Sequence, residues 1–146
     1  MNIPGQTDAS VKPWMPAVLI IAGIYNLLFG AWAVLFPNMA FTGLGMEAPQ
    51  YPFLWQCVGM IVGVYGIGYL AASRDPLRHW PIVLVGMLGK IFGPIGFVQT
   101  AVAGDISWSF GIMIIFNDLI WWIPFTALLV AAWKQHHRTL QDDEDR

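Results

Sequence analysis

The chain has 146 residues, of which 57% are hydrophobic and 11% charged, whereas soluble domains carry about 25% charged residues. This composition excludes an ordinary soluble globular protein, and a net charge of -2 with scattered basic residues excludes a nucleic-acid partner. A single cysteine, Cys57, excludes a disulfide framework, a CxxC redox pair and a cysteine-based zinc site within one chain.

The chain opens with a polar leader, residues 1–13, followed by an apolar run over residues 14–36. This run has about 20 apolar positions, longer than the roughly 7 to 15 of a signal peptide, and no A-x-A-like cleavage site follows it. We therefore predict a retained first membrane span. Its small and polar residues recur at helical spacing on one face; they are Gly23, Asn26 and Gly30.

Two further apolar runs, residues 52–72 and 81–102, have the length of about 20 residues that a helix needs to cross a bilayer. The loop before them, residues 37–51, is the one connection long enough to hold structure of its own. Each run carries a stripe of small residues, which lets membrane helices approach closely. The stripes are Gly59, Gly63 and Gly66 with Gln56, and Gly86, Gly89, Gly93 and Gly96.

The fourth apolar run, residues 109–133, completes an all-α, integral membrane four-helix bundle. After it comes a basic and then acidic tail, residues 134–146, which we expect to be solvated. Tryptophans favour the headgroup level of a bilayer. Trp14, Trp80 and Trp133 therefore predict one interfacial belt and Trp32, Trp55 and Trp108 the other.

Positive charges predict how the spans are oriented. Lys12, Arg74, Arg78, Lys134 and Arg138 all fall on the side of the two termini and the middle loop, whereas the first and third loops contain no lysine or arginine. Basic residues accumulate on the cytoplasmic side of a membrane protein. We therefore expect a multi-pass protein of the inner (plasma) membrane with both termini in the cytoplasm.

Lys90 stands out because it lies in the middle of the third span, beside the glycine stripe. At 1.5 Å per residue it is about 14 Å from the start of its helix, too deep for its side chain to reach water easily. Asp118, about 16 Å from the same surface of a 30 Å film, is at a matching depth, and so is Asn26. We predict a cluster of Lys90, Asp118 and Asn26, with Asn117 pointing about 100° away from Asp118 on an ideal helix.

Two prolines and two tryptophans lie near Lys90 and Asp118 in the third and fourth spans. Pro94 and Pro124 cannot donate hydrogen bonds to the carbonyls of Lys90 and Ile120, so both spans are candidates for a kink. Trp121 and Trp122 admit two interpretations, namely packing or the wall of a pocket for a quinone, a lipid or another apolar ligand. The candidate ligand or ion-pair cluster comprises Lys90, Asp118, Asn26, Gln56, Asn117, Trp121, Trp122, Tyr25 and Tyr65.

Charged residues at the centre of a span cost about 2.5 to 3.5 kcal/mol each on insertion scales, and they usually mark function. A paired charge can also do no more than set the register of the helices. The sequence is compatible with both interpretations. His79, His136 and His137 lie at the edges of the spans, and no haem-ligand pair, flavin motif or iron–sulfur spacing occurs, so no cofactor or catalytic residue is identified.

Two segments resemble a group of small bacterial four-span proteins of unknown role that often carry the label alkyl hydroperoxide reductase. They are Gly89-Lys90-Ile91-Phe92-Gly93-Pro94-Ile95-Gly96-Phe97 and Asn117-Asp118-Leu119-Ile120-Trp121-Trp122-Ile123-Pro124-Phe125. One cysteine does not supply the chemistry of that label. The layout is also similar to the DoxX-type membrane proteins. That resemblance implies a subunit of a membrane oxidoreductase complex that passes electrons to quinone.

The leading hypothesis is a small inner-membrane accessory protein, serving a membrane or soluble redox or stress-response partner, whose interior cluster binds a small apolar or anionic ligand. An enzyme acting on its own is not expected. One alternative is a proton-linked transporter or channel that uses Lys90 and Asp118, and another is a purely structural membrane subunit. Assembly of several copies into a homo-oligomer stays open.

Overall fold

The protein is an all-α bundle with four helical stretches long and apolar enough to cross a membrane, as predicted. The computed structural model describes residues 11–144. The first three spans are single helices, α1 (Trp14–Leu35), α3 (Pro52–Ala72) and α4 (Trp80–Ala103). The fourth consists of η1 (Trp108–Phe110), α5 (Gly111–Asn117), η2 (Leu119–Trp121) and α6 (Trp122–Glu144), and the loop after α1 contains the short helix α2 (Met39–Thr42).

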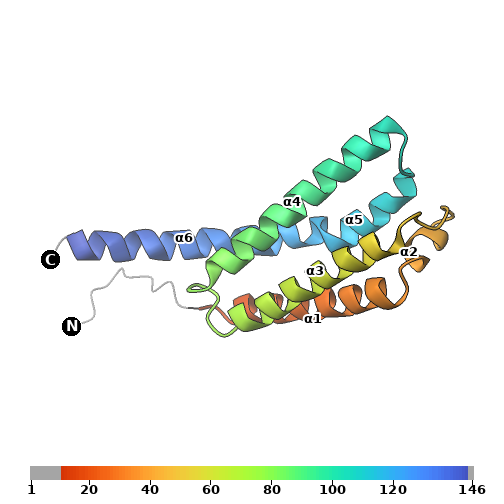
Figure 1. Cartoon of the computed structure of the whole chain (residues 1–146). Coiled ribbons are helices and arrows are strands. Elements are labelled where there is room, and N and C mark those ends of the chain that lie inside the picture. The colour runs from red at the N-terminus through yellow and green to blue at the C-terminus, as the bar shows by residue number, and fades with distance from the viewer. Residues whose placement is uncertain (1–10, 145–146) are drawn as a thin grey trace.

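The helices form two pairs. α1 and α3 lie side by side along their length, whereas α4 packs against α6 near the end where the chain terminates and diverges from α3 toward the other end (Figure 1). α1 begins and α6 ends on the same side of the bundle. Where α4 diverges from α3, α5 lies between these two helices in the view of Figure 1.

Glycines bring α1 and α3 close together. A Cβ atom added at Gly30 would lie 2.6 Å from the carbonyl oxygen of Gly59, and one added at Gly66 would lie 2.8 Å from that of Gly23. Such close backbone approach is the usual role of small residues in membrane helices. The predicted stripes of α1 and α3 therefore form a packing seam. Gly96 of α4, by contrast, is exposed, and a Cβ atom added there would meet no neighbouring atom within 4 Å.

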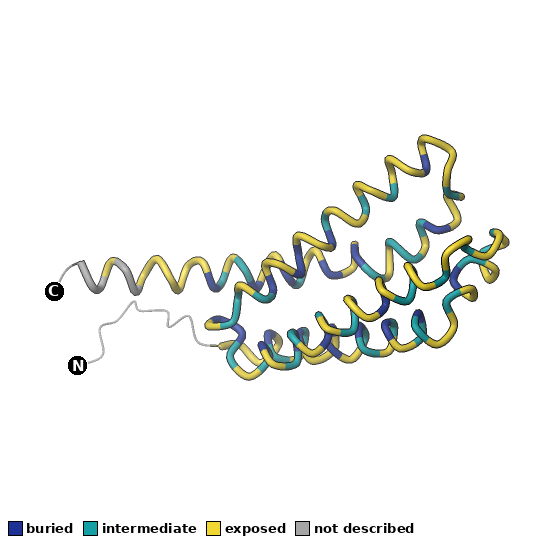
Figure 2. Tube along the Cα trace, viewed as in Figure 1, coloured by how far each residue is buried: buried dark blue, intermediate teal, exposed yellow. Residues whose placement is uncertain are grey.

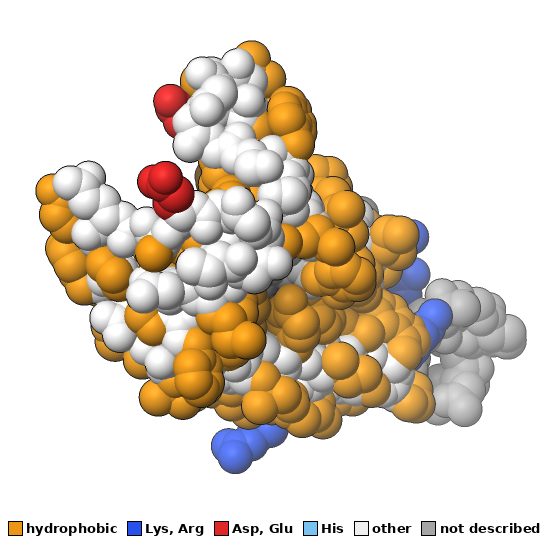
Figure 3. All heavy atoms as spheres, turned by 90° about the vertical axis from the view of Figure 1, so that its right-hand side faces the viewer, with side chains coloured by type: hydrophobic (Ala, Val, Ile, Leu, Met, Phe, Trp, Pro, Cys, Tyr) orange, Lys and Arg blue, Asp and Glu red, His pale blue; other side chains and the backbone are white. Residues whose placement is uncertain are grey.

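We call the end of the bundle where α1 begins and α6 leaves it the terminal end, and the opposite end the loop end. The buried core lies toward the terminal end and includes Leu19, Tyr69, Val83, Phe125 and Leu128. Many positions on the outside of the spans are exposed (yellow in Figure 2), and hydrophobic side chains gather on the sides of the bundle in the face that Figure 3 shows. Exposed apolar side chains on every long helix include Ile21, Leu28, Val64, Phe92 and Ile123. Large exposed apolar surfaces are normal where lipid replaces water, so this is a multi-pass membrane protein.

The fourth span is interrupted at Asp118, although we expected one helix over residues 109–133. Pro124 explains the interruption, because a proline has no N–H for the carbonyl of Ile120 and its ring collides with that carbonyl in a continuous helix. The segment before it tightens into η2, and Pro124 becomes the third residue of α6, where the N–H has no partner within the helix. Pro94, by contrast, lies inside the uninterrupted α4.

The structure adds detail to two other expectations. The predicted solvated tail continues α6 as a helix to Glu144, with Lys134, His136 and His137 exposed; Asp145 and Arg146 lie outside the described residues, as do residues 1–10 of the leader. Trp55, predicted for the outer belt, is half-buried and packs inside the bundle, because the loop containing α2 and the start of the fourth span cover it.

Candidate functional site

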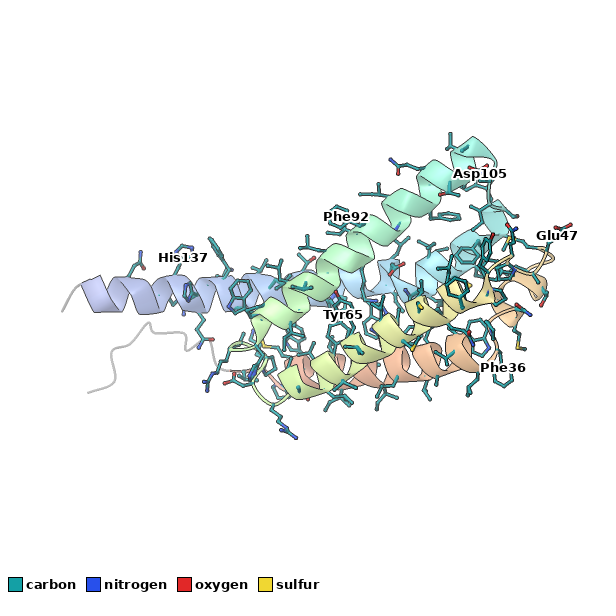
Figure 4. All side chains as sticks on the ribbon, in the orientation of Figure 1. Phe36, Glu47, Tyr65, Phe92, Asp105 and His137 are labelled. Carbon is teal, nitrogen blue, oxygen red and sulfur yellow. The ribbon has the colours of Figure 1, made fainter. Side chains whose placement is uncertain are left out.

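A cavity of about 300 Å³ separates the α1–α3 pair from α4 and the fourth span. α3 contributes Trp55, Val58, Ile61, Val62, Tyr65 and Tyr69 to its wall, and α4 contributes the glycines Gly86, Gly89 and Gly93. Asn26, Lys90, Asn117 and Asp118 also line it, so most of the wall is apolar and the polar groups are few. Tyr65 lies at the centre of the bundle in Figure 4.

Lys90 and Asp118 form a buried ion pair in the wall of this cavity. The Lys90 Nζ lies 3.9 Å from the Asp118 Oδ1, and the two residues are 5% and 6% exposed. The Asn117 side chain donates a hydrogen bond of 3.0 Å from Nδ2 to the same carboxylate oxygen. Gly93 lies directly opposite, because a Cβ atom there would be 3.2 Å from Asp118 Oδ2. The glycine therefore makes room for the carboxylate.

The interruption of the fourth span gives Lys90 a second partner. The backbone N–H of Trp121 donates to the carbonyl of Asp118 (3.1 Å) and not to that of Asn117. The Asn117 carbonyl therefore lacks the partner that it would have in a continuous helix. The Lys90 ammonium donates to this carbonyl. A cation is favourable at the C-terminus of a helix such as α5, where unpaired carbonyls carry partial negative charge. Lys90 thus binds both the carboxylate and the open end of α5.

Pro94 leaves the Lys90 carbonyl without a backbone donor, and Trp122 takes its place. The indole Nε1 of Trp122 donates a hydrogen bond of 2.9 Å to that carbonyl. An unpaired carbonyl in the interior of a membrane protein costs several kcal/mol unless a side chain or water satisfies it. Trp122 is therefore a hydrogen-bond donor to the α4 backbone. This role differs from both sequence-based interpretations, packing and the wall of a pocket.

Replacing Trp122 by phenylalanine is expected to destabilise the protein by about 1 to 3 kcal/mol, because the Lys90 carbonyl loses its indole donor. Thermal unfolding in detergent, followed by circular dichroism, measures this loss. The same change in a Pro94→Ala background serves as the control, because the alanine N–H can donate to that carbonyl and the penalty should shrink. Equal penalties in the two backgrounds would exclude the hydrogen bond as the cause.

Several polar atoms at the cavity have no hydrogen-bond partner among the described residues. Asn26 is 3% exposed, and its Oδ1 is one of them; the others that line the cavity are Asn117 Oδ1 and Trp55 Nε1. Buried polar groups are almost always paired with protein, water or ligand. The cavity therefore offers two acceptors and one donor to a molecule that enters it.

An aromatic cluster of Phe29, Phe41, Trp55 and Phe110 covers the loop end of the cavity. The ring of Trp55 lies 5.3 Å from Phe41, 5.9 Å from Phe110 and 6.3 Å from Phe29, and all three contacts are edge-to-face. Such geometry is favourable for aromatic pairs. Phe41 comes from α2, so the first loop packs onto Trp55 and Phe110, two rings that line this end of the cavity.

The structure brings Lys90, Asp118, Asn26, Asn117 and Tyr65 to the cavity wall. Other predicted residues lie around it. Trp121 is buried with its ring centroid 5.8 Å from the Lys90 Nζ, and Tyr25 packs 5.7 Å from Trp121. Gln56 lies apart, since its Nε2 donates to the carbonyl of Val34 (2.9 Å) and so joins α3 to the end of α1.

Sequence reasoning missed Tyr69 and the aromatic cluster. Tyr69 is 1% exposed, and its hydroxyl occupies the space that a side chain at Gly86 would need. The spacing held a signal, because Tyr65 and Tyr69 are four residues apart and so share one face of a helix. Nothing in the sequence indicated that Phe41 and Phe110 would meet Trp55, since these residues come from a loop, the fourth span and α3.

The site contains a cation, an anion, amides and aromatic rings, and these groups can bind, orient or relay protons. Among the side chains that the structure describes, no three of His, Cys, Asp or Glu lie where they could share a metal ion. Cys57 is exposed and lies outside the cavity wall. Compared with known proteins, the chain matches no protein-family model, no curated protein and no solved structure.

Proposed function

We propose that this protein is a small ligand-binding membrane protein that takes up a neutral, amphipathic molecule from the bilayer. The observation that carries the proposal is the cavity itself, a mostly apolar space of about 300 Å³ with buried, incompletely hydrogen-bonded polar groups at one side. Pockets of this kind are the usual form of small-molecule sites. A molecule with an apolar body and one polar end matches both parts of the wall.

Access from the lipid supports this ligand class. Val58 and Ile61 line the cavity and are also 43% and 58% exposed, so the cavity extends to the outer surface of α3. The loop end is covered by the aromatic cluster of Phe29, Phe41, Trp55 and Phe110. A molecule dissolved in the bilayer therefore has a shorter path to Lys90 than one dissolved in water.

The charge of the wall favours a neutral ligand over an anionic one. The positive charge of Lys90 is already opposed by Asp118 and by the carbonyl end of α5, so little of it is left for an anion. The remaining unpaired atoms, Asn26 Oδ1, Asn117 Oδ1 and Trp55 Nε1, suit a group that both donates and accepts hydrogen bonds. A hydroxyl group meets that requirement.

The cellular setting belongs to the same proposal. Basic residues at the terminal end and only Glu47 and Asp105 at the loop end support an inner-membrane protein with both termini in the cytoplasm (Figure 4). An accessory role for a redox or stress-response partner depends on the DoxX-like resemblance. Bound ligand would then be presented to, or stored for, that partner.

The test is retention of the ligand by a cavity-filling variant. Gly89 lines the cavity and has open space around it, so Gly89→Leu should fill the site without a clash. Gly96→Leu is the matched control, because Gly96 is on the same helix, equally unobstructed and outside the cavity wall. After purification in mild detergent, mass spectrometry of the extracted small molecules should find one compound in the wild type and in Gly96→Leu, and little or none in Gly89→Leu.

Two results would count against the proposal. Preparations of the wild type without any co-purifying amphipathic compound would leave the cavity without a ligand. Equal retention by Gly89→Leu and Gly96→Leu would place the compound elsewhere on the protein, most simply on its lipid-facing surface. Circular dichroism of both variants verifies that each has the helical content of the wild type.

Proton-linked transport is the second candidate, and the interrupted fourth span favours it. Transporters commonly bind substrate and ions where a helix is broken at mid-membrane, because the free backbone groups there can ligate them. Here Lys90 and Asp118 lie at such a break. Transport predicts pH-dependent flux in liposomes that Lys90→Met abolishes, whereas the binding function alone predicts no flux in either protein.

A further inference from the structure

A second hollow, separate from the central cavity, lies at the terminal end of the molecule between the start of α4 and the middle of α6. It has a volume of about 590 Å³ and shares no residue with the cavity around Lys90. We call it the α4–α6 groove. Its walls come from Trp80 and Leu84 on α4 and from the stretch of α6 between Thr126 and His136.

The polarity of the α4–α6 groove changes along its length. Its deeper part is apolar, with Leu84, Leu129 and Val130, and it ends at Lys134 and His136. From Thr126 to His136 the helix rises about 15 Å, which is the length of much of one acyl chain. The groove is therefore apolar where the span lies and basic where the span ends.

Two tryptophans lie between these parts. Trp80 and Trp133 line the groove, and Trp133 is 63% exposed, with its ring 4.3 Å from that of His137. Tryptophan rings favour the level of the headgroups and the glycerol backbone, where an apolar ring and a polar N–H are both accommodated. Lys134, the first charged residue of α6, is exposed one residue further along. This order matches the parts of a phospholipid from tail to headgroup.

We propose that the α4–α6 groove binds one anionic glycerophospholipid, with an acyl chain along Leu84, Leu129 and Val130 and its phosphate at Lys134 and His136. The positive charge at one end and the apolar wall at the other are complementary to that molecule. Basic pockets between membrane helices on the cytoplasmic side are recognised sites for anionic headgroups.

Native mass spectrometry in a non-ionic detergent tests the proposal with two added lipids, phosphatidylglycerol and zwitterionic phosphatidylcholine. The wild type should retain one phosphatidylglycerol molecule in preference to phosphatidylcholine. The double change Lys134→Gln with His136→Gln should lower that preference about fivefold, because one basic side chain near the phosphate is worth about 1 kcal/mol. Both side chains are exposed, so the fold should persist.

Arg74→Gln is the matched control, because Arg74 is a basic residue in the loop between α3 and α4 and does not line the groove. It should retain phosphatidylglycerol as the wild type does. A second variant, Val130→Trp, narrows the apolar part and should lower retention of both lipids. Loss of preference equally in Arg74→Gln would overturn the proposal in favour of general surface attraction. A dimer peak that Lys134→Gln with His136→Gln abolishes would overturn it by assigning the groove to a second copy of the chain.

Discussion

Replacing Lys90 by methionine is expected to destabilise the protein by about 3 to 5 kcal/mol, the usual cost of leaving one member of a buried ion pair without its partner. The change leaves the Asp118 carboxylate with a single hydrogen bond, from Asn117, and leaves the Asn117 carbonyl without the Lys90 donor. Both groups are in the interior of the bundle, where water cannot easily replace the lost ammonium. Unfolding in mixed detergent micelles, followed by circular dichroism, measures the loss.

The double variant Lys90→Met with Asp118→Leu shows how much of this loss comes from an unpaired charge. It removes both ions together, so no buried charge is left unpaired. The Asn117 carbonyl and the Asn117 Nδ2 lose their partners, but both are neutral groups, which cost less to leave unpaired than a buried charge does. We therefore expect the double variant to be more stable than either single variant. Losses that simply add would mean that the two side chains are not coupled.

The same variants distinguish a ligand site from a device that sets helix register. If the pair only fixes register, the double variant that regains stability should also retain the co-purifying molecule and the cellular phenotype. If the pair binds ligand, the double variant should be folded but empty. The extraction experiment described for Gly89→Leu supplies the readout, with Gly96→Leu again as the folded reference.

Gly30→Ala should destabilise the bundle by about 1 to 3 kcal/mol, because it overpacks the seam between α1 and α3. The new methyl group would lie 2.6 Å from the Gly59 carbonyl oxygen and 2.9 Å from the Gly63 nitrogen. Both are backbone atoms, which cannot rotate away as a side chain would. The two helices must separate along their contact, and a lower midpoint of thermal unfolding should report this.

Gly63→Ala is the control for that experiment. Gly63 lies on α3 beside the same seam, but a Cβ atom there meets no neighbour within 4 Å. Alanine is also better than glycine inside a helix by about 0.5 to 1 kcal/mol. The variant should therefore be as stable as the wild type or slightly more so. If Gly63→Ala lost as much stability as Gly30→Ala, close approach at Gly30 would not be the reason.

Reasoning from depth along a helix was enough to bring Lys90 and Asp118 to one level, because rise per residue is nearly constant in any helix. It was not enough for Asn117. The expected angle of about 100° between Asn117 and Asp118 assumes a continuous helix. The interruption at Asp118 removes that assumption, and the backbone carbonyl of Asn117 then accepts from Lys90 while its side chain donates to Asp118.

Pro94 and Pro124 are a second case in which the sequence of one helix does not predict the structure. Both remove one backbone donor, and both were equal candidates for a kink. In the structure α4 stays continuous at Pro94 and the Trp122 indole satisfies the Lys90 carbonyl, whereas the fourth span breaks ahead of Pro124. The donor that replaces the missing backbone N–H at Pro94 comes from a neighbouring helix. A local pattern does not contain that neighbour.

The sequence by itself determined the fold class, since four apolar runs of membrane length in a chain with few charges can satisfy their backbone groups in lipid only as helices. It also identified Lys90 and Asp118, because charges inside such runs are rare. Only the tertiary structure decided the break in the fourth span, the roles of Trp122 and Trp55, and the cavity. These depend on contacts between residues far apart in the chain, and helical periodicity carries no information about which helices become neighbours.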